Sequence, residues 1–281
     1  MPLLGTFAAA SARGFGRGLA AVATTAGIFN ADSNSANLWA AVPLTTYKSA
    51  STGGGFVDVS PQIRTAMGLT AGTAKSYNQG TAAINTTTTV APFAWYTNSL
   101  LFPSSYGATT DLTYTSSTLG SNQAMTVECR IYVPNTNIYP AILATNPLGS
   151  GGYYCCWTIG VGYPGYQDIN YFSNYGSPSG RVTSSGTSLT LNAWNHVAFV
   201  FNGSTNLKMF INGTKCYDGD YAENASGSGP TTIGPTNWDG YGNSNGVKMV
   251  DYRIYTGVQK YSASFTVSDT NPDLGGAILA A

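Results

Sequence analysis

The chain has 281 residues, which is long enough for one large domain or two ordinary ones. Charged side chains make up only 9% of it, and 12 basic and 12 acidic residues give a formal net charge of zero. This balance excludes a broad nucleic-acid-binding surface, which needs clustered Lys and Arg to displace counterions. A hydrophobic fraction of 43% excludes charge-rich disorder and is enough for a sizeable core. Together with 34 glycines, this composition favours turn-rich β structure and gives little sign of an enzyme.

The first 36 residues form a leader whose composition differs from that of the rest of the chain. It is rich in Ala and Gly, and its glycines interrupt any helical period. We therefore expect it to be mostly irregular and to become ordered only when it docks on a partner. The docking side chains that we expect are Phe7, Phe15, Arg13 and Arg17. The alternative is a flexible leader whose aromatic residues have no docking role. We expect neither a secretory signal nor a membrane span.

From Asn37 onward, short strand candidates alternate with turns rich in Gly, Asn and Ser. A short apolar strand is expected at 99–102, before Pro103, and one short turn of helix at 61–67. Residues 124–133 alternate between apolar and polar side chains, which is typical of a half-buried antiparallel strand. The apolar face consists of Met125, Val127, Cys129, Ile131 and Val133, and the other face of Thr126, Glu128, Arg130 and Tyr132.

The best hairpin signal lies between Trp194 and Ile211. A strand at 196–201 runs into a turn at 202–206, and the chain returns along 207–211. Asn212-Gly213 is a strong two-residue turn that leads to a third strand at 214–217. Because the first strand is apolar on both faces, we expect both to be covered, the outer one by a neighbouring subunit. A later strand at 247–255 alternates less cleanly, and the pattern as a whole predicts an all-β sandwich.

The four cysteines, Cys129, Cys155, Cys156 and Cys216, do not have the spacing of a zinc site. The adjacent pair at 155–156 has poor geometry for a disulfide. A buried thiol is the favoured interpretation of Cys129, and a bridge between Cys129 and Cys216 is the alternative.

Residues 191–213 resemble the laminin-G-like or concanavalin A-like jelly-roll family, in which a Trp-x-His-Val-Ala strand is followed by Asn/Asp-Gly turns. The matching residues are Trp194-Asn195-His196-Val197-Ala198, Asn202-Gly203 and Asn212-Gly213. Residues 125–133 look like the family's Thr-Ile-Glu-Phe-Trp-Val strand, and 251–255 look like its closing Asp-Glu-Val-Arg-Ile-Tyr strand. The resemblance implies a two-sheet antiparallel jelly roll at 37–265, between the leader at 1–36 and a C-terminal tail at 266–281.

The leader at 1–36 resembles a second group of proteins. Its Leu-Gly-Thr-Phe and Ala-Arg-Gly-Phe-Gly segments look like the leaders of tailed-phage structural proteins. This implies a virion protein, such as a tail fibre, a spike or a capsid decoration, that binds other virion proteins through the leader. We expect a homo-oligomer, and a trimer in the case of a fibre.

Some members of the jelly-roll family are glycanases, which need two carboxyl groups on either side of the scissile bond. The chain has two glutamates, Glu128 and Glu223, and neither lies in the Glu-x-Asp-x-(x)-Glu signature of those enzymes. A Ser–His–Asp triad would have to use the single histidine, His196, but the sequence has no Gly-x-Ser-x-Gly motif to supply the serine. The resemblance implies a structural role for His196. We therefore predict no catalytic residue and interpret the chain as non-enzymatic.

Neutral sugars are commonly bound by aromatic faces, with amide and hydroxyl groups that contact the sugar hydroxyls. Two stretches, 153–175 and 237–245, offer this chemistry. The ligand-binding residues that we expect are Trp238, Tyr241, Asn243, Tyr163 and Tyr166. Packing within the sandwich or between subunits is the alternative, because Tyr and Trp also favour interfaces.

No cofactor is expected, although calcium is considered because this fold can bind it through Asp and Asn oxygens. The residues considered are Asp239, Asn243 and Asn245 in one loop and Asp218 and Asp220 in another. Neither group has a fixed calcium-loop spacing, so a solvated acidic turn is the preferred interpretation.

The leading hypothesis is a non-enzymatic virion structural protein that carries a lectin-like sandwich, with host surface glycans as a candidate ligand. One alternative is a secreted or surface carbohydrate-binding module, and a glycanase is the less favoured one. The first places the chain in the virion and the second outside the cell or at its surface.

Overall fold

The computed structural model describes residues 33–42, 47–48, 55–66, 68–72, 76–79, 83–85, 99–102, 112–134, 141–145, 157–162, 167–172, 181–221, 228–234 and 246–267. The four docking residues expected in the leader lie outside these ranges. Within them, no helix has the length and apolarity needed to cross a membrane.

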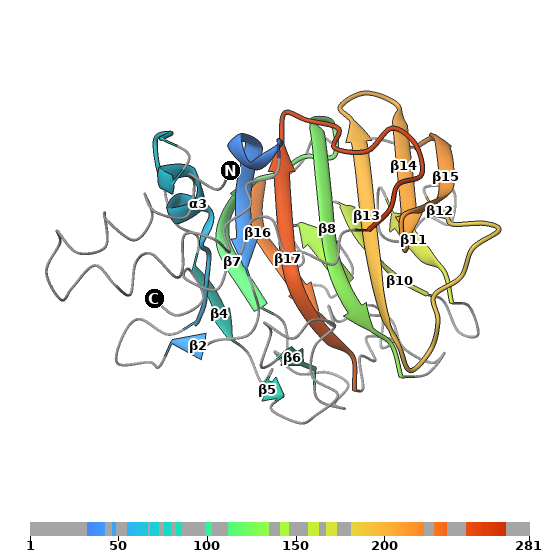
Figure 1. Ribbon diagram of the computed structural model, residues 1–281, viewed down its shortest axis with the longest axis horizontal. Helices are drawn as coiled ribbons and strands as arrows, with labels where there is room; N and C mark the ends of the chain where they lie inside the picture. The colour runs from blue at the N-terminus through green and yellow to red at the C-terminus, as the bar shows by residue number, and fades with distance from the viewer. Residues whose placement is uncertain are drawn as a thin grey trace, which may run out of the picture.

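Two antiparallel sheets are stacked face to face, as Figure 1 shows. The front sheet contains β1 (Leu38–Val42), β5 (Ala83–Asn85), β6 (Ser99–Leu101), β8 (Ala124–Tyr132), β13 (Trp194–Asn202), β14 (Asn206–Ile211), β15 (Thr214–Asp220) and β17 (Lys248–Thr256). The back sheet contains β2 (Tyr47–Lys48), β3 (Gly55–Val57), β4 (Ser76–Gln79), β7 (Leu112–Thr118), β9 (Ala141–Thr145), β10 (Trp157–Val161), β11 (Ile169–Phe172), β12 (Arg181–Thr183) and β16 (Ser228–Gly234).

Helical structure in the described residues is confined to the 3-10 turn η1 (Ser35–Asn37) and the short helix α3 (Ser60–Ala66). The helical turn expected at 61–67 and the all-β jelly-roll sandwich are therefore both confirmed. The domain limits at 36 and 265 stay predictions.

β13 lies between β8 and β14 in the front sheet. It pairs with β8 over its whole length, from Trp194 opposite Tyr132 to Asn202 opposite Ala124. On its other side, β14 and then β15 follow in antiparallel register, as the hairpin signal predicts. Asn212 and Gly213 have φ angles of 50° and 78°, the left-handed pair that a two-residue hairpin turn requires.

The less regular alternation of the last strand has a structural cause in β17. The register of β17 against β8 shifts between Val250 and Arg253, and Asp251 has a φ angle of 57°. A β-bulge adds one residue to one strand of a pair and so changes the phase of its side chains. Consequently Met249 and Tyr252, three positions apart, both pack into the core.

The main core lies between the two sheets. The alternating apolar side chains of β8 pack there, together with those of β13, β14 and β17. Tyr171 of β11 reaches across the sandwich and makes edge-to-face contacts with Phe201 and Tyr221, at centroid distances of 5.6 and 5.2 Å. Its hydroxyl lies 3.0 Å from Ser121 Oγ, so the polar end of this buried ring is satisfied.

The outer face of the front sheet, which is turned away from the back sheet, is also covered. The segment at 257–267, which we call the strap, crosses in front of β8 and β13 in Figure 1. Ala198, Val200 and Phe210 form a small buried cluster on this face, against Tyr261 and Phe265 of the strap. The two strap rings stack on each other with centroids 3.7 Å apart.

The strap corrects two expectations. The outer face of the 196–201 strand is covered by the chain's own strap, so its two apolar faces do not indicate a subunit interface. The strand at 124–133 is not half-buried, because Thr126 and Glu128 on its polar face are 0% and 1% exposed. Both expectations failed because strap and strands are far apart in the sequence.

Cys129 and Cys216 are buried free thiols, so the bridge considered between them does not form. The other two cysteines lie outside the described residues.

Candidate functional site

A buried ion cluster surrounds Glu128 beneath the strap. Lys260 Nζ of the strap lies 2.7 Å from Glu128 Oε1, and Arg253 Nη1 of β17 lies 3.5 Å from the same oxygen. The hydroxyl of Tyr261 donates to Glu128 Oε2 at 2.7 Å. His196 Nε2 lies 3.3 Å from that oxygen. Both carboxylate oxygens therefore have partners.

The pKa values in this cluster follow from burial and charge. Burial by itself would raise the pKa of Glu128, but the charges of Lys260 and Arg253 and the contact with His196 outweigh it and hold the pKa well below 4.5. Burial lowers the pKa of His196 below 6.5, against the opposing influence of Glu128. At neutral pH a neutral imidazole therefore donates from Nε2 to an ionised carboxylate.

This cluster joins the strap to the sheet and is not open to a substrate. The side chain of Glu128 is 0% exposed and that of His196 is 5% exposed. A polysaccharide has no access to this carboxylate while the strap is in place. The structural role expected for His196 agrees with this geometry, and Glu128 is paired with Lys260 and Arg253.

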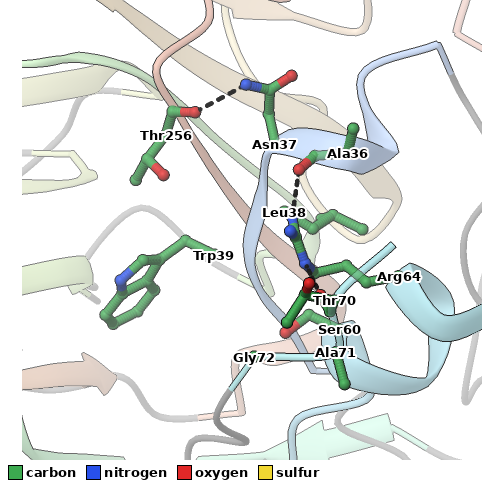
Figure 2. Close-up of a pocket in the computed structure, with 10 residues that line it drawn as sticks. All are labelled: Ala36, Asn37, Leu38, Trp39, Ser60, Arg64, Thr70, Ala71, Gly72 and Thr256. Carbon is green, nitrogen blue, oxygen red and sulfur yellow. Dashed lines mark hydrogen bonds between the residues drawn. The ribbon is translucent and has the colours of Figure 1, made fainter. Parts of the chain in front are cut away.

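A pocket of about 300 Å³ opens at the edge of the sandwich, beside β1, and is shown in Figure 2. Its walls come from η1, the start of β1, α3, the turn at 70–72 and the end of β17. The lining residues are Ala36, Asn37, Leu38, Trp39, Ser60, Arg64, Thr70, Ala71, Gly72 and Thr256. An aromatic residue, an amide, hydroxyls and one charged group thus line one concave site, which is the usual composition of a small-ligand pocket. In Figure 2 the ring of Trp39 points away from Arg64, on the other side of β1.

Local sequence explains why α3 starts next to β1. Asp58 lies two residues before the first residue of the helix, and its Oδ1 accepts hydrogen bonds from the backbone N–H groups of Ser60 and Ala41, both at 2.9 Å. The first bond caps the helix and the second ties the cap to β1. A backbone bond from Val59 N to Ala41 O at 2.8 Å completes the attachment.

The end of α3 directs the chain back toward the pocket. Gly68 N donates to Thr65 O and Leu69 N donates to Arg64 O, both at 2.9 Å. This pair of bonds is a Schellman motif, and the φ angle of 73° at Gly68 is the left-handed conformation that it needs. The motif brings the following residue, Thr70, over the helix.

Arg64 is fixed at the pocket by the backbone on both sides. Its Nε donates to Thr70 O at 2.8 Å, and its Nη1 donates to Ala36 O. Figure 2 shows the guanidinium between these two carbonyl groups. The amide of Asn37 donates to Thr256 O at 3.1 Å and fixes η1 to the end of β17. Trp39 is partly buried, and one part of it packs against the main core.

The five ligand-binding residues expected from the sequence lie outside the described residues. The strands that flank their two segments are described. Gly160 of β10, which precedes 163–166, and Gly234 of β16, which precedes 235–245, both pair with Ala141 of β9. The two segments therefore begin at the same end of the back sheet, but the roles expected for their residues stay predictions.

The two groups of residues considered as calcium ligands are only partly described. Asp239, Asn243 and Asn245 lie outside the described residues. Asp218 is bound by Lys215 Nζ at 2.6 Å and by the amide of Asn206 at 3.0 Å, so its oxygens already have partners. In the part of the chain that the structure describes, no three His, Cys, Asp or Glu side chains are grouped to hold a metal ion.

A family model described as the concanavalin A-like lectin/glucanases superfamily matches residues 105–260, more than half of the chain. The chain belongs to this superfamily. The match runs from the segment before β7 to the strap, and so includes the three motifs that carry the sequence resemblance.

Two solved structures are similar to this superfamily member. The binding domain of Paraclostridial Mosquitocidal Protein 1 has a TM-score of 0.51 and 12% identity, over 85% of this chain and 52% of that one. The receptor-binding domain of botulinum neurotoxin type G has a TM-score of 0.50 and 13% identity, over 86% of this chain and 51% of that one. The chain thus corresponds to about half the length of each, and identities this low show the fold alone. No curated protein matches the chain.

Sequence reasoning missed the pocket. The sequence predicted a jelly roll from residue 37 and a helical turn at 61–67, but it did not predict that Trp39 and Arg64 line one pocket. The one available signal was the Asp58-Val59-Ser60-Pro61 run, a helix start that predicts the orientation of α3 but not its partner.

Proposed function

We propose that this member of the superfamily is a non-enzymatic binding module whose pocket beside β1 binds a saccharide. The observation that supports this best is a pocket of about 300 Å³ that is lined by Trp39 and by several hydrogen-bonding residues. An indole offers an apolar face of the size of a sugar ring, and it loses little rotamer freedom on binding. The volume lies at the lower end of ligand sites and suits one sugar residue.

The polar groups of the pocket are suited to sugar hydroxyls. Ser60 and Thr70 carry hydroxyls that both donate and accept, and the Asn37 amide adds a further acceptor. These groups stand on backbone that is fixed by the cap of α3, by the Schellman motif and by the bond from Asn37 to Thr256. A site on such supported backbone needs little ordering when a ligand binds.

The test is saccharide binding by the full chain, measured on a glycan array and then by titration calorimetry. Trp39→Ala should lose about two- to tenfold in affinity, because an aromatic ring contact contributes about 0.5–1.5 kcal/mol. Trp39→Leu keeps apolar packing against the core without the ring, and should lose affinity similarly. Trp194→Ala is the matched control, since Trp194 is also partly buried on the front sheet but does not line the pocket.

Trp238→Ala tests the binding segment predicted from the sequence. Loss of binding in Trp238→Ala with normal binding in both Trp39 variants would move the site to 237–245 and refute the pocket. Binding of no saccharide at all would refute the proposed function.

We propose further that the chain is a structural protein of a virion, as a tail fibre, a spike or a decoration, and docks through its leader. The support is the resemblance of the leader to those of tailed-phage structural proteins and the 9% charged residues, which leave few charges to desolvate between packed subunits. Deletion of residues 1–30 should leave a folded sandwich that no longer enters particles. Incorporation of the truncated chain would refute docking by the leader.

The alternative is a secreted or surface carbohydrate-binding module, which the same pocket would serve. The two functions differ in processing: N-terminal sequencing of the mature protein should find Met1 in a virion protein, and a cleaved leader in a secreted one. The homo-oligomer, with a trimer for a fibre, is part of the virion proposal. Light scattering on the purified chain tests it.

A further inference from the structure

We infer that the pocket selects an acidic saccharide, whose carboxylate binds Arg64. This inference rests on the proposed saccharide-binding function and specifies the class of sugar. The first observation is that the guanidinium has unused hydrogen-bond donors. An arginine has five N–H donors, and Arg64 uses one at Nε and one at Nη1 for backbone carbonyls. The remaining three have no hydrogen-bond partner among the described residues.

The charge of the pocket is positive and has no counter-charge in the lining. Arg64 is the only charged side chain among the ten lining residues. The ion pairs found in the described part of the chain do not include it, whereas Arg253 pairs with Asp251 at 3.0 Å and Lys260 pairs with Glu128. Asp58 is close in sequence, but its Oδ1 accepts backbone hydrogen bonds at the start of α3 and it does not line the pocket. An anionic group is therefore the favoured partner.

The geometry favours a carboxylate on a sugar over a free anion. Two carbonyls hold the guanidinium in one orientation, so its free N–H groups are presented in a fixed plane, which suits the two oxygens of a carboxylate. The hydroxyls of Ser60 and Thr70 line the same pocket and provide contacts for sugar hydroxyls. A uronic acid carries both partners on one residue: a carboxylate for Arg64 and hydroxyls for these side chains.

The experiment compares two ligands with one skeleton. Oligogalacturonate and its fully methyl-esterified form differ in the charge of the carboxyl group and share every ring and hydroxyl. Calorimetry with the full chain should show about ten- to a hundredfold tighter binding of the acid, as expected for hydrogen bonds to a charged group. Arg64→Gln should remove this difference between the acid and the ester. Arg64→Lys, which keeps the charge and loses the planar fork, should retain part of it.

Arg181→Gln is the matched control. Arg181 is a partly buried arginine on β12 whose Nε donates to Thr183, and it does not line the pocket. This variant should bind both ligands as the unmodified chain does. Because the ligand pair is first compared on the unmodified chain, the main result does not depend on the folding of any variant.

The possible results separate the inference from the proposed function. Equal affinity for the acid and the ester, or a preference for the acid that survives in Arg64→Gln, would overturn the inference and leave saccharide binding intact. Tight binding of sulfated oligosaccharides with no binding of the carboxylated one would also overturn it. Failure of both ligands and of every neutral saccharide would overturn the proposed function as well.

Discussion

Replacing Glu128 by Gln should destabilise the fold strongly, because it removes the negative charge from a buried cluster and leaves the positive charges behind. The side chain of Glu128 is 0% exposed, and those of Lys260 and Arg253 are each 7% exposed. Arg253 keeps Asp251 at 3.0 Å, so the unpaired charge is mainly that of Lys260. Breaking a buried pair in this way typically costs about 3–5 kcal/mol. That is a large share of a total stability of about 5–15 kcal/mol.

The effect has a defined pH dependence. The pKa of Glu128 in the folded protein lies well below 4.5, whereas in the unfolded chain the carboxyl titrates near its ordinary value. The ionised carboxylate therefore stabilises the fold fully above about pH 5, and the contribution is lost as the pH falls through the folded pKa. The difference between the variant and the unmodified chain should be full at pH 7 and should shrink below pH 4.5.

Urea unfolding followed by tryptophan fluorescence measures this difference, with Asp218→Asn as the matched control. Lys215 lies 2.6 Å from Asp218, close to the 2.7 Å between Lys260 and Glu128, but the side chain of Asp218 is 36% exposed. An exposed pair contributes at most about 1 kcal/mol. If Glu128→Gln costs no more than Asp218→Asn at pH 7, burial of the cluster does not determine its contribution and the reasoning is wrong.

Three further predictions concern the strap and the buried groups. A β-carbon at Gly213 would lie 2.1 Å from a carbonyl oxygen of the strap, whereas one at Gly186 would meet nothing within 4 Å, at similar φ angles of 78° and 74°. Gly213→Ala should thus lose clearly more stability than the roughly 1 kcal/mol that the φ angle costs in Gly186→Ala; equal losses in urea unfolding would contradict this. Because burial lowers the pKa of His196 below 6.5, the unfolded chain binds a proton there that the folded chain does not, and stability should fall from pH 7.5 to 5.5. His196→Gln should remove that fall, and an unchanged pH profile would be evidence against it. Burial raises the pKa of the Cys129 thiol and raises that of Cys216 to about 11, so both should be alkylated at pH 8 only after urea is added, as peptide mass spectrometry can test.

The strands could be predicted from the sequence because their signals are local. The alternation of 124–133 and the Asn-Gly turn at 212–213 lie within a few residues of the structure that they specify. The strap has no such signal: Lys260, Tyr261 and Phe265 form no periodic pattern, and Lys260 and Glu128 are 132 residues apart. The sequence therefore indicated that the outer face of β13 is covered, but not by which part of the protein.

The pocket was not predictable for the same reason. The helix that carries Arg64 was expected, but its contact with β1, which carries Trp39, depends on the bonds of Asp58 across to that strand. The expected sugar-binding residues were chosen by composition, because segments that combine aromatic residues with Gly and Asn are common in binding sites in general.

The pairing of β1 with β17 has a consequence for how the protein is made. Asn37, next to β1, bonds to Thr256 at the end of β17, 219 residues later. During translation, β1 leaves the ribosome long before β17, its partner, has been synthesised. The apolar cluster on β13 and β14 also stays uncovered until the strap has been synthesised. Contacts this distant in sequence slow folding. The nascent chain must therefore keep an unpaired edge and an uncovered face from aggregating until β17 and the strap have been synthesised, so chaperone supply during expression should govern its soluble yield.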